Sequence, residues 1–196
     1  MNASLRNLPE GPRPMRLFRP FALLLALLAP VAQAQTAPAA EPAGPVPYHL
    51  EVVLFRQGEP IASGQPAPED WARNVNLRAS EVRASTRLDA EVAKLTPENG
   101  YEVLMHRAWR QTLGPTASHV AIGEGEPQLG QYPVHGTLRL RLDRLVEMQA
   151  ELWVNQLNEG QIVQSEQIKQ NRRLKPGELT FVDGTSLGLL VRATPE

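Results

Sequence analysis

The sequence predicts an α+β domain, in which one main helix at about residues 85–95 packs on an antiparallel, meander-like β-sheet. Two observations support this fold class. Segments of β-type sequence outnumber helical segments and follow one another through short turns, as in antiparallel sheets. A single segment combines helical periodicity with clear end signals.

The helix is expected in "STRLDAEVAKL" (residues 85–95). Leu88, Val92 and Leu95 recur at positions i, i+4 and i+7 and would form one apolar stripe on a helix. A proline and an Asn-Gly pair follow shortly afterwards and would end it.

Apolar and β-branched segments predict three strands in the first two thirds of the chain. The first begins with "YHLEVVLFR" at Tyr48, and a Gly- and Pro-rich loop follows it at Gln57–Asp70. A second strand is expected at Tyr101–Arg110, and a short one at His119–Ile122 within a long connection.

The strand at Tyr101–Arg110 contains "HRAWRQ", in which two arginines flank Trp109. Apolar residues lie on both faces of this strand, which is typical of a central strand buried on both sides. Arg107 shares a face with Trp109, whereas Arg110 points to the other face. We therefore expect Trp109 to lie in the core or at its edge. Of the two arginines Arg107 and Arg110, we expect Arg110 to be the contact residue.

The C-terminal third predicts a hairpin with one wet face. "HGTLRLRLDRL" and "MQAELWV" both place apolar residues at even positions and polar ones at odd positions. A polar strand is expected next at about Ile162–Leu174, followed by "LTFV" and "LGLLVRAT" after two turns. These segments follow one another in meander order.

The alternation limits the pairing of the hairpin, because facing residues must have numbers that add to an even value. With a three-residue loop at Leu145–Glu147, Arg141 faces Glu151 and Arg139 faces Trp153. A shift by two residues would instead place Asp143 against Glu151, a disfavoured pair of like charges.

This polar face supplies most of the candidate contacts for a ligand or a partner. In either register an arginine stands beside Trp153, an arrangement suited to a sugar ring next to a carboxylate. The alternative is that a second helix or a loop covers Trp153 and makes it core. The other candidates are guanidinium groups, which either bind carboxylates bidentately or are merely solvated or ion-paired. They are Arg139, Arg141 and the pairs Arg107/Arg110 and Arg172/Arg173.

The N-terminus predicts a secretory signal peptide over residues 1–34. Arginines precede a short apolar run at Phe21–Ala29, and a small-x-small pattern ends at Ala34, where cleavage is expected. The apolar run is too short for a membrane anchor, which needs about 20 residues. Residues 1–14 are interpreted as an upstream extension, since translation from Met15 would give a more typical signal.

Residues 35–47 form a Pro/Ala-rich tether, and residues 48–196 are expected to fold as a single domain. Residues 1–34 hold four arginines and one glutamate, so the remainder has 16 basic and 20 acidic residues and a net charge of −4. Such a chain is not expected to bind nucleic acid. It has no cysteine, which excludes thiol catalysis and thiolate metal sites.

No catalytic apparatus, metal site or cofactor site is predicted. The four histidines lack metal-ligand spacing, and "GEGEP" (Gly123–Pro127) lacks the lysine and the following helix of a phosphate-binding loop. No G-x-S-x-G motif surrounds a serine, and nothing singles out a pair of carboxylates for glycosidic cleavage.

Several blocks, taken in order, resemble the CsiV family of periplasmic peptidoglycan-binding proteins of Gram-negative bacteria. They are "YHLEVVLF", "EDW", "YEVLMHRAWRQ", "GTLRLRLDRLVEMQAELWV", "RRLKPGELTFVD" and "LGLLVRATP". The resemblance covers about Tyr48–Pro195. It is poor at Gly58–Ala84, and the region after "ELWV" is shorter than in the family pattern.

The resemblance implies a non-enzymatic periplasmic protein that binds peptidoglycan and supports cell-wall synthesis. It further implies action through the lipoprotein activator of a bifunctional penicillin-binding protein, but no residue-level site. Two alternatives stay open: a protein–protein adaptor that does not touch glycan, with Trp153 as an anchor, and, least favoured, a murein-modifying enzyme.

Overall fold

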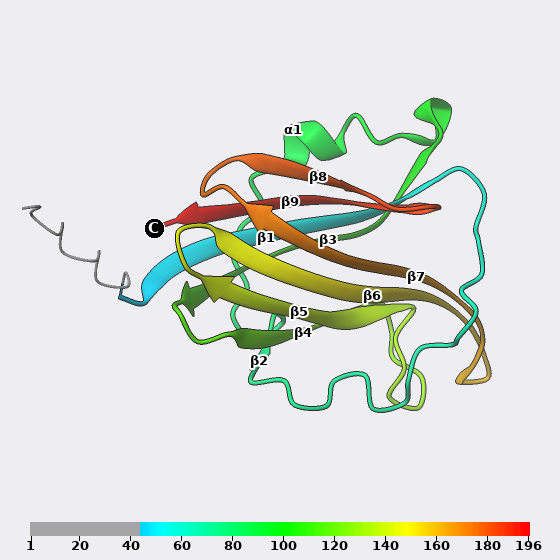
Figure 1. Ribbon diagram of the computed structural model, residues 1–196. Helices are drawn as coiled ribbons and strands as arrows, with labels where there is room; N and C mark the ends of the chain where they lie inside the picture. Colours follow the sequence, from blue (N-terminus) through cyan, green and yellow to red (C-terminus); the bar gives the residue numbers. More distant parts are fainter. Residues whose placement is uncertain (1–43) are drawn as a thin grey trace, which may run out of the picture. The chain divides into compact units, whose positions relative to one another are not determined.

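The computed structural model describes residues 44–196. The signal peptide expected at residues 1–34, with its extension 1–14, and most of the tether at 35–47 lie outside the described residues. Within them, nine strands form two sheets that face each other (Figure 1).

The first sheet is antiparallel throughout and has the strand order β3-β1-β9-β8. Its strands are β1 (Val46–Gln57), β3 (Tyr101–Leu113), β8 (Leu179–Asp183) and β9 (Leu187–Pro195). Strand β1 lies between β3 and β9, so the first strand of the fold pairs with the last.

The second sheet has the order β2-β4-β5-β6-β7, and only the pairing of β2 with β4 is parallel. Its strands are β2 (Leu77–Arg78), β4 (Ser118–Glu124), β5 (Val134–Leu142), β6 (Val146–Asn158) and β7 (Gln161–Leu174). The predicted meander holds for β5 to β7 but breaks there, because β8 and β9 belong to the first sheet.

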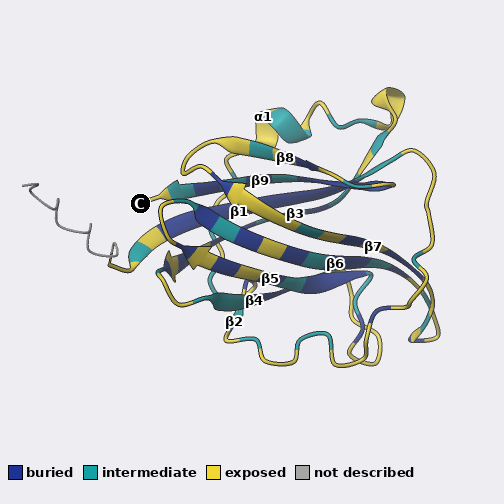
Figure 2. Ribbon diagram, in the orientation of Figure 1, coloured by how far each residue is buried: buried dark blue, intermediate teal, exposed yellow. Residues whose placement is uncertain are grey.

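The core lies between the two sheets and is built from alternate residues of the strands, whose side chains point inwards. Buried Leu50, Val52 and Leu54 of β1 belong to the same apolar cluster as Leu138 and Leu140 of β5. Figure 2 shows buried positions alternating with more exposed ones along β5 and β6. Each such side chain contributes roughly 1.5–3 kcal/mol on burial, which explains why the even-numbered face predicted for the hairpin points inwards.

The predicted fold class is wrong, because the described residues contain no main helix and the fold is mostly β. Helix α1 is a single turn, Asp89–Val92, and a short 3₁₀ helix, η1, covers Pro97–Asn99. Of the apolar stripe, Leu88 is fully buried, but Val92 and Leu95 are only partly buried.

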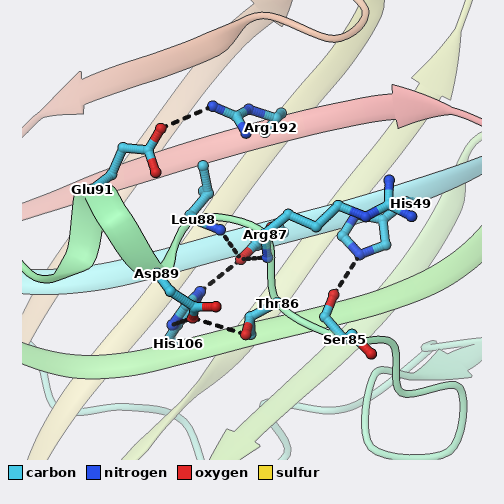
Figure 3. Close-up of polar contacts among 10 residues, drawn as sticks. His49, Ser85, Thr86, Arg87, Leu88, Asp89, Glu91, His106 and Arg192 are labelled. Atoms are coloured by element: carbon cyan, nitrogen blue, oxygen red, sulfur yellow. Dashed lines mark hydrogen bonds and ion pairs between the residues drawn. The ribbon is translucent and has the colours of Figure 1, made fainter.

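A buried carboxylate explains where the helical turn begins (Figure 3). Glu51, on the outer face of β1, has no exposed surface, and its carboxylate accepts the backbone N–H groups of Arg87 and Leu88 at 2.9 Å. His106 Nε2 of β3 lies 2.7 Å from the same carboxylate. Contacts with β1 and β3 therefore hold residues 85–88 outside a helix. At the other end, backbone bonds from Lys94 and Leu95 span only three residues and end the turn well before Pro97.

Strand β3 is an edge strand of the first sheet and not the central strand that the sequence indicates. Its outer edge is covered by the chain at residues 82–84, where Ala84 N–H donates to Ala108 O (3.0 Å) and Arg110 N–H to Val82 O (2.9 Å). Trp109 is fully buried, as predicted, and its indole N–H donates to Gln111 Oε1 at 2.6 Å. The chain at residues 82–84 thus gives β3 a hydrogen-bonded neighbour on both edges, as a central strand has.

The β5–β6 hairpin keeps the predicted parity but has a different register. Arg141 faces Glu147, and Arg139 faces Gln149, around a turn at residues 143–145. The reason is Val146, which is fully buried and extends the apolar face of β6 towards the turn. The predicted loop at Leu145–Glu147 would have left this residue out of the core.

Candidate functional site

The segment between β1 and β2, residues 58–76, crosses the second sheet and places Trp71 on its outer face. Ser63 N–H donates to Ser165 O of β7 (2.7 Å), and Asn76 N–H donates to His119 O of β4 (3.0 Å). The ring of Trp71 stacks on that of His135, with centroids 4.6 Å apart and planes 6° apart. An aromatic ring thus joins a loop to the sheet.

This loop determines the environment of Trp153. The ring of Trp153 packs edge-on against the ring of His135, with centroids 6.1 Å apart, and Trp153 is only 6% exposed. The structure therefore puts Trp153 under the loop, as in the alternative considered for it. In the register observed, Trp153 faces His135 and Gln167 and not an arginine.

A cavity of about 450 Å³ opens beside Trp71. Its aromatic walls are Trp71 and Tyr132, whose rings meet at 86° with centroids 6.0 Å apart. Its arginines come from three segments: Arg78 from β2, Arg83 from the chain that covers β3, and Arg107 from β3 itself. We call this the aromatic–arginine pocket.

The three arginines of the pocket differ in their partners. Arg107 is 15% exposed and pairs with Glu124 of β4. Arg78 and Arg83 are exposed, and no described carboxylate lies within 4 Å of either guanidinium. Two guanidinium groups without a carboxylate partner thus lie in one pocket with two aromatic rings, and Glu124 and Glu126 also line it.

A close approach of backbone to ring forms one wall of the pocket. A Cβ atom at Gly123 would lie 3.2 Å from the ring of Tyr132, which is tighter than ordinary van der Waals contact. The glycine therefore lets Tyr132 lie flat against β4, with its edge towards Trp71. A larger residue at 123 would displace the ring into the pocket.

Burial lowers the pKa of His135 to about 4, from its usual value of 6.5. Between these values the unfolded chain binds a proton that the folded protein does not. The stability that the protein owes to neutral, buried His135 is therefore fully present above pH 6.5 and is lost as the pH falls towards 4. The free energy of unfolding should fall by about 2–3 kcal/mol over this interval.

Urea unfolding of the wild type and of His135→Phe at pH values across this interval measures the effect. The phenyl ring can still stack on Trp71 but does not titrate, so the variant should lose less stability than the wild type as the pH falls. Equal losses in the two proteins would show that His135 does not carry this pH dependence.

The structure brings some of the arginines predicted from the sequence together and separates others. Arg139, Arg141 and Arg173 point to the polar face of the second sheet, on β5 and β7, and Arg172 lines a depression beside them. Arg110 lies on the first sheet, where its Nε donates to Glu196 at 3.0 Å.

The sequence prediction missed four residues of the pocket: Trp71, Arg78, Arg83 and Tyr132. Trp71 carried the one usable signal, a large aromatic residue at the end of a Gly- and Pro-rich loop. The sequence pairs Arg107 with Arg110, but the structure separates the two: Arg107 lines the pocket, and Arg110 contacts Glu196.

Comparison with known families identifies the chain. The model of the family described as "Peptidoglycan-binding protein, CsiV" matches residues 82–196, more than half of the chain. The matched part includes Arg83, Arg107 and Tyr132, whereas Trp71 and Arg78 precede it. Comparisons with curated proteins and with solved structures found no match. No helix among the described residues is long and apolar enough to cross a membrane. The resemblance noted in the sequence is thus confirmed, and the chain belongs to the CsiV family of peptidoglycan-binding proteins.

Proposed function

We propose that the protein binds peptidoglycan in the aromatic–arginine pocket. Membership of a peptidoglycan-binding family supports the ligand, and the pocket supplies matching chemistry. Peptidoglycan combines sugar rings with carboxylates of its peptide stems. Aromatic rings offer flat apolar surfaces to sugars, and guanidinium groups bind carboxylates through two parallel hydrogen bonds.

The observation that carries this proposal is the pairing of Trp71 and Tyr132 with two exposed guanidinium groups that have no carboxylate partner in the described chain. A sugar would lie against the rings while Arg78 and Arg83 bind the neighbouring carboxylate. Arg107 already pairs with Glu124 and closes the wall of the pocket towards β4.

We also propose a role beyond binding. The protein would be exported to the periplasm after cleavage of its signal peptide near Ala34. There it would support cell-wall synthesis, without enzymatic activity of its own, through the lipoprotein activator of a penicillin-binding protein. The signal-like N-terminus and the family resemblance support this role. Its direct tests are a pull-down of that activator, and muropeptide profiles of sacculi incubated with the protein, which should stay unchanged.

Pocket variants test the binding site. We expect Arg83→Ala to weaken binding to purified sacculi about tenfold, or about 1.4 kcal/mol, because it removes one carboxylate contact. Trp71→Ala should weaken binding by a similar factor. The measurement is the bound fraction in a sacculus pull-down over a range of protein concentrations, with thermal unfolding to confirm that each variant folds.

Arg110→Ala is the matched control, because Arg110 is also an exposed arginine but lies on the first sheet, paired with Glu196. It should bind like the wild type. If Arg110→Ala lost binding while Arg83→Ala kept it, the pocket would not be the site. If the wild type stayed in the supernatant at low salt, direct binding to peptidoglycan would be refuted.

A further inference from the structure

A second surface, outside the pocket, concentrates positive charge on a chain whose formal net charge is −1. It occupies the end of the second sheet near the β5–β6 turn and consists of Arg139, Arg141, Arg144 and Arg173, which we call the arginine face. Two carboxylates lie among these four arginines, Asp143 and Glu147.

The strand register gives the arginine face a defined pattern. Arg141, Glu147 and Arg173 face one another across β5, β6 and β7, and Arg139, Gln149 and Asn171 form the next row. Adjacent strands are about 4.8 Å apart, and alternate residues of a strand are roughly 7 Å apart. The strand register therefore sets the spacing of Arg139, Arg141 and Arg173 on this face.

Glu147 is largely occupied by its neighbours. Arg141 Nε donates to it at 3.0 Å, and Arg173 Nε lies 3.7 Å from its other oxygen. The hydrogen bond from Arg141 lowers the pKa of Glu147, so the carboxylate stays charged. Arg139 and Arg144 have no carboxylate within 4 Å in the described part of the chain. Two exposed cations of the face are thus left over.

Three shallow depressions surround Glu147, each of about 260–280 Å³. One is lined by Arg139 and Arg141, one by Arg172 and Arg173, and one by Arg144 and Arg173. Several small depressions around one centre suit a ligand that makes many contacts over a flat surface, and not one small molecule in a cleft.

We propose that the arginine face docks an acidic protein segment whose carboxylates sit over Arg139 and Arg144. The carboxylates within the face favour a protein over a lipid surface: a uniformly anionic bilayer would press its charges against Glu147 and Asp143, whereas a folded or extended chain can place carboxylates opposite the arginines alone. This inference goes beyond the proposed function, because it uses neither the pocket nor peptidoglycan.

The test uses the whole protein and a labelled synthetic peptide in which glutamate alternates with serine. When extended, this peptide carries carboxylates roughly 7 Å apart on one side. Fluorescence anisotropy at low salt should show binding that weakens as salt is added. A peptide with glutamine in place of glutamate should not bind, and vesicles of phosphatidylglycerol should bind more weakly than the acidic peptide.

Single charge reversals locate the site. Arg139→Glu and Arg144→Glu should each raise the Kd about fivefold, and Lys94→Glu, which changes the net charge equally but lies near α1, should raise it less than about twofold. Arg139→Gln and Arg144→Gln repeat the test without new repulsion. If Lys94→Glu weakened peptide binding equally, the peptide would be attracted only by the overall charge. Tighter binding to the vesicles than to the peptide would indicate a lipid surface. Either result would overturn the proposal. Sacculus binding should not change in these variants, so failure here is distinguishable from failure at the pocket.

Discussion

Replacement of Glu51 by alanine is expected to lower the free energy of unfolding by about 3–5 kcal/mol, because each buried donor left without an acceptor costs roughly 1–3 kcal/mol. The carboxylate is fully buried and accepts two backbone N–H groups, and it lies against His106. Alanine would leave these donors buried without an acceptor. It would also release residues 85–88 from the first sheet.

Chemical unfolding and hydrogen exchange measure this effect. In Glu51→Ala, the amides of Arg87 and Leu88 should exchange much faster than in the wild type. The matched control is Glu102→Ala, which removes a glutamate that is 60% exposed and pairs with Arg56 on the same sheet. If the two variants lost equal stability, Glu51 would not anchor this segment.

Gly136→Ala is expected to destabilise the protein by at least about 3 kcal/mol, at the upper end of the cost of overpacking a core. A Cβ atom at this position would lie 2.1 Å from Glu151 O and 2.7 Å from Leu152 Cα, both backbone atoms of the neighbouring strand β6. The backbone also has φ +155°, which L-residues rarely adopt. Strands β5 and β6 would have to separate at the centre of the second sheet.

Thermal and urea unfolding provide the measurement, with Gly64→Ala as the control. A Cβ atom at Gly64 meets nothing within 4 Å, and that backbone is not in the left-handed region. Its replacement should leave stability unchanged or slightly raised, because alanine restricts the unfolded chain. Similar melting temperatures for the two variants would contradict the close packing of β5 on β6.

The sequence predicts well those features that depend on neighbours along the chain. Alternation identified the strands and the inward face of the hairpin, and it placed Trp109 in the core. The helical spacing of apolar residues misled, because the start of α1 is set by Glu51, a residue of a distant strand. Alternation chose the wrong hairpin register, because the burial of Val146 depends on the facing sheet.

The pocket lies beyond the reach of such patterns. Arg78 is positioned by the parallel pairing of β2 with β4, and Arg83 by an isolated bridge to Trp109. Trp71 is positioned by stacking on His135, a residue far along the chain. None of these pairings leaves a periodic signal, so the residues that line the pocket become neighbours only in the folded protein.

The position of β1 between β3 and β9 has a consequence for the order of folding. The central strand of the first sheet is made early, but one of its two partners, Leu187–Pro195, is made much later. Pairings between such distant segments close large loops and slow the folding reaction. The first sheet therefore cannot be completed until Leu187–Pro195 has been synthesised, and loss of this segment would expose one edge of β1 to its surroundings.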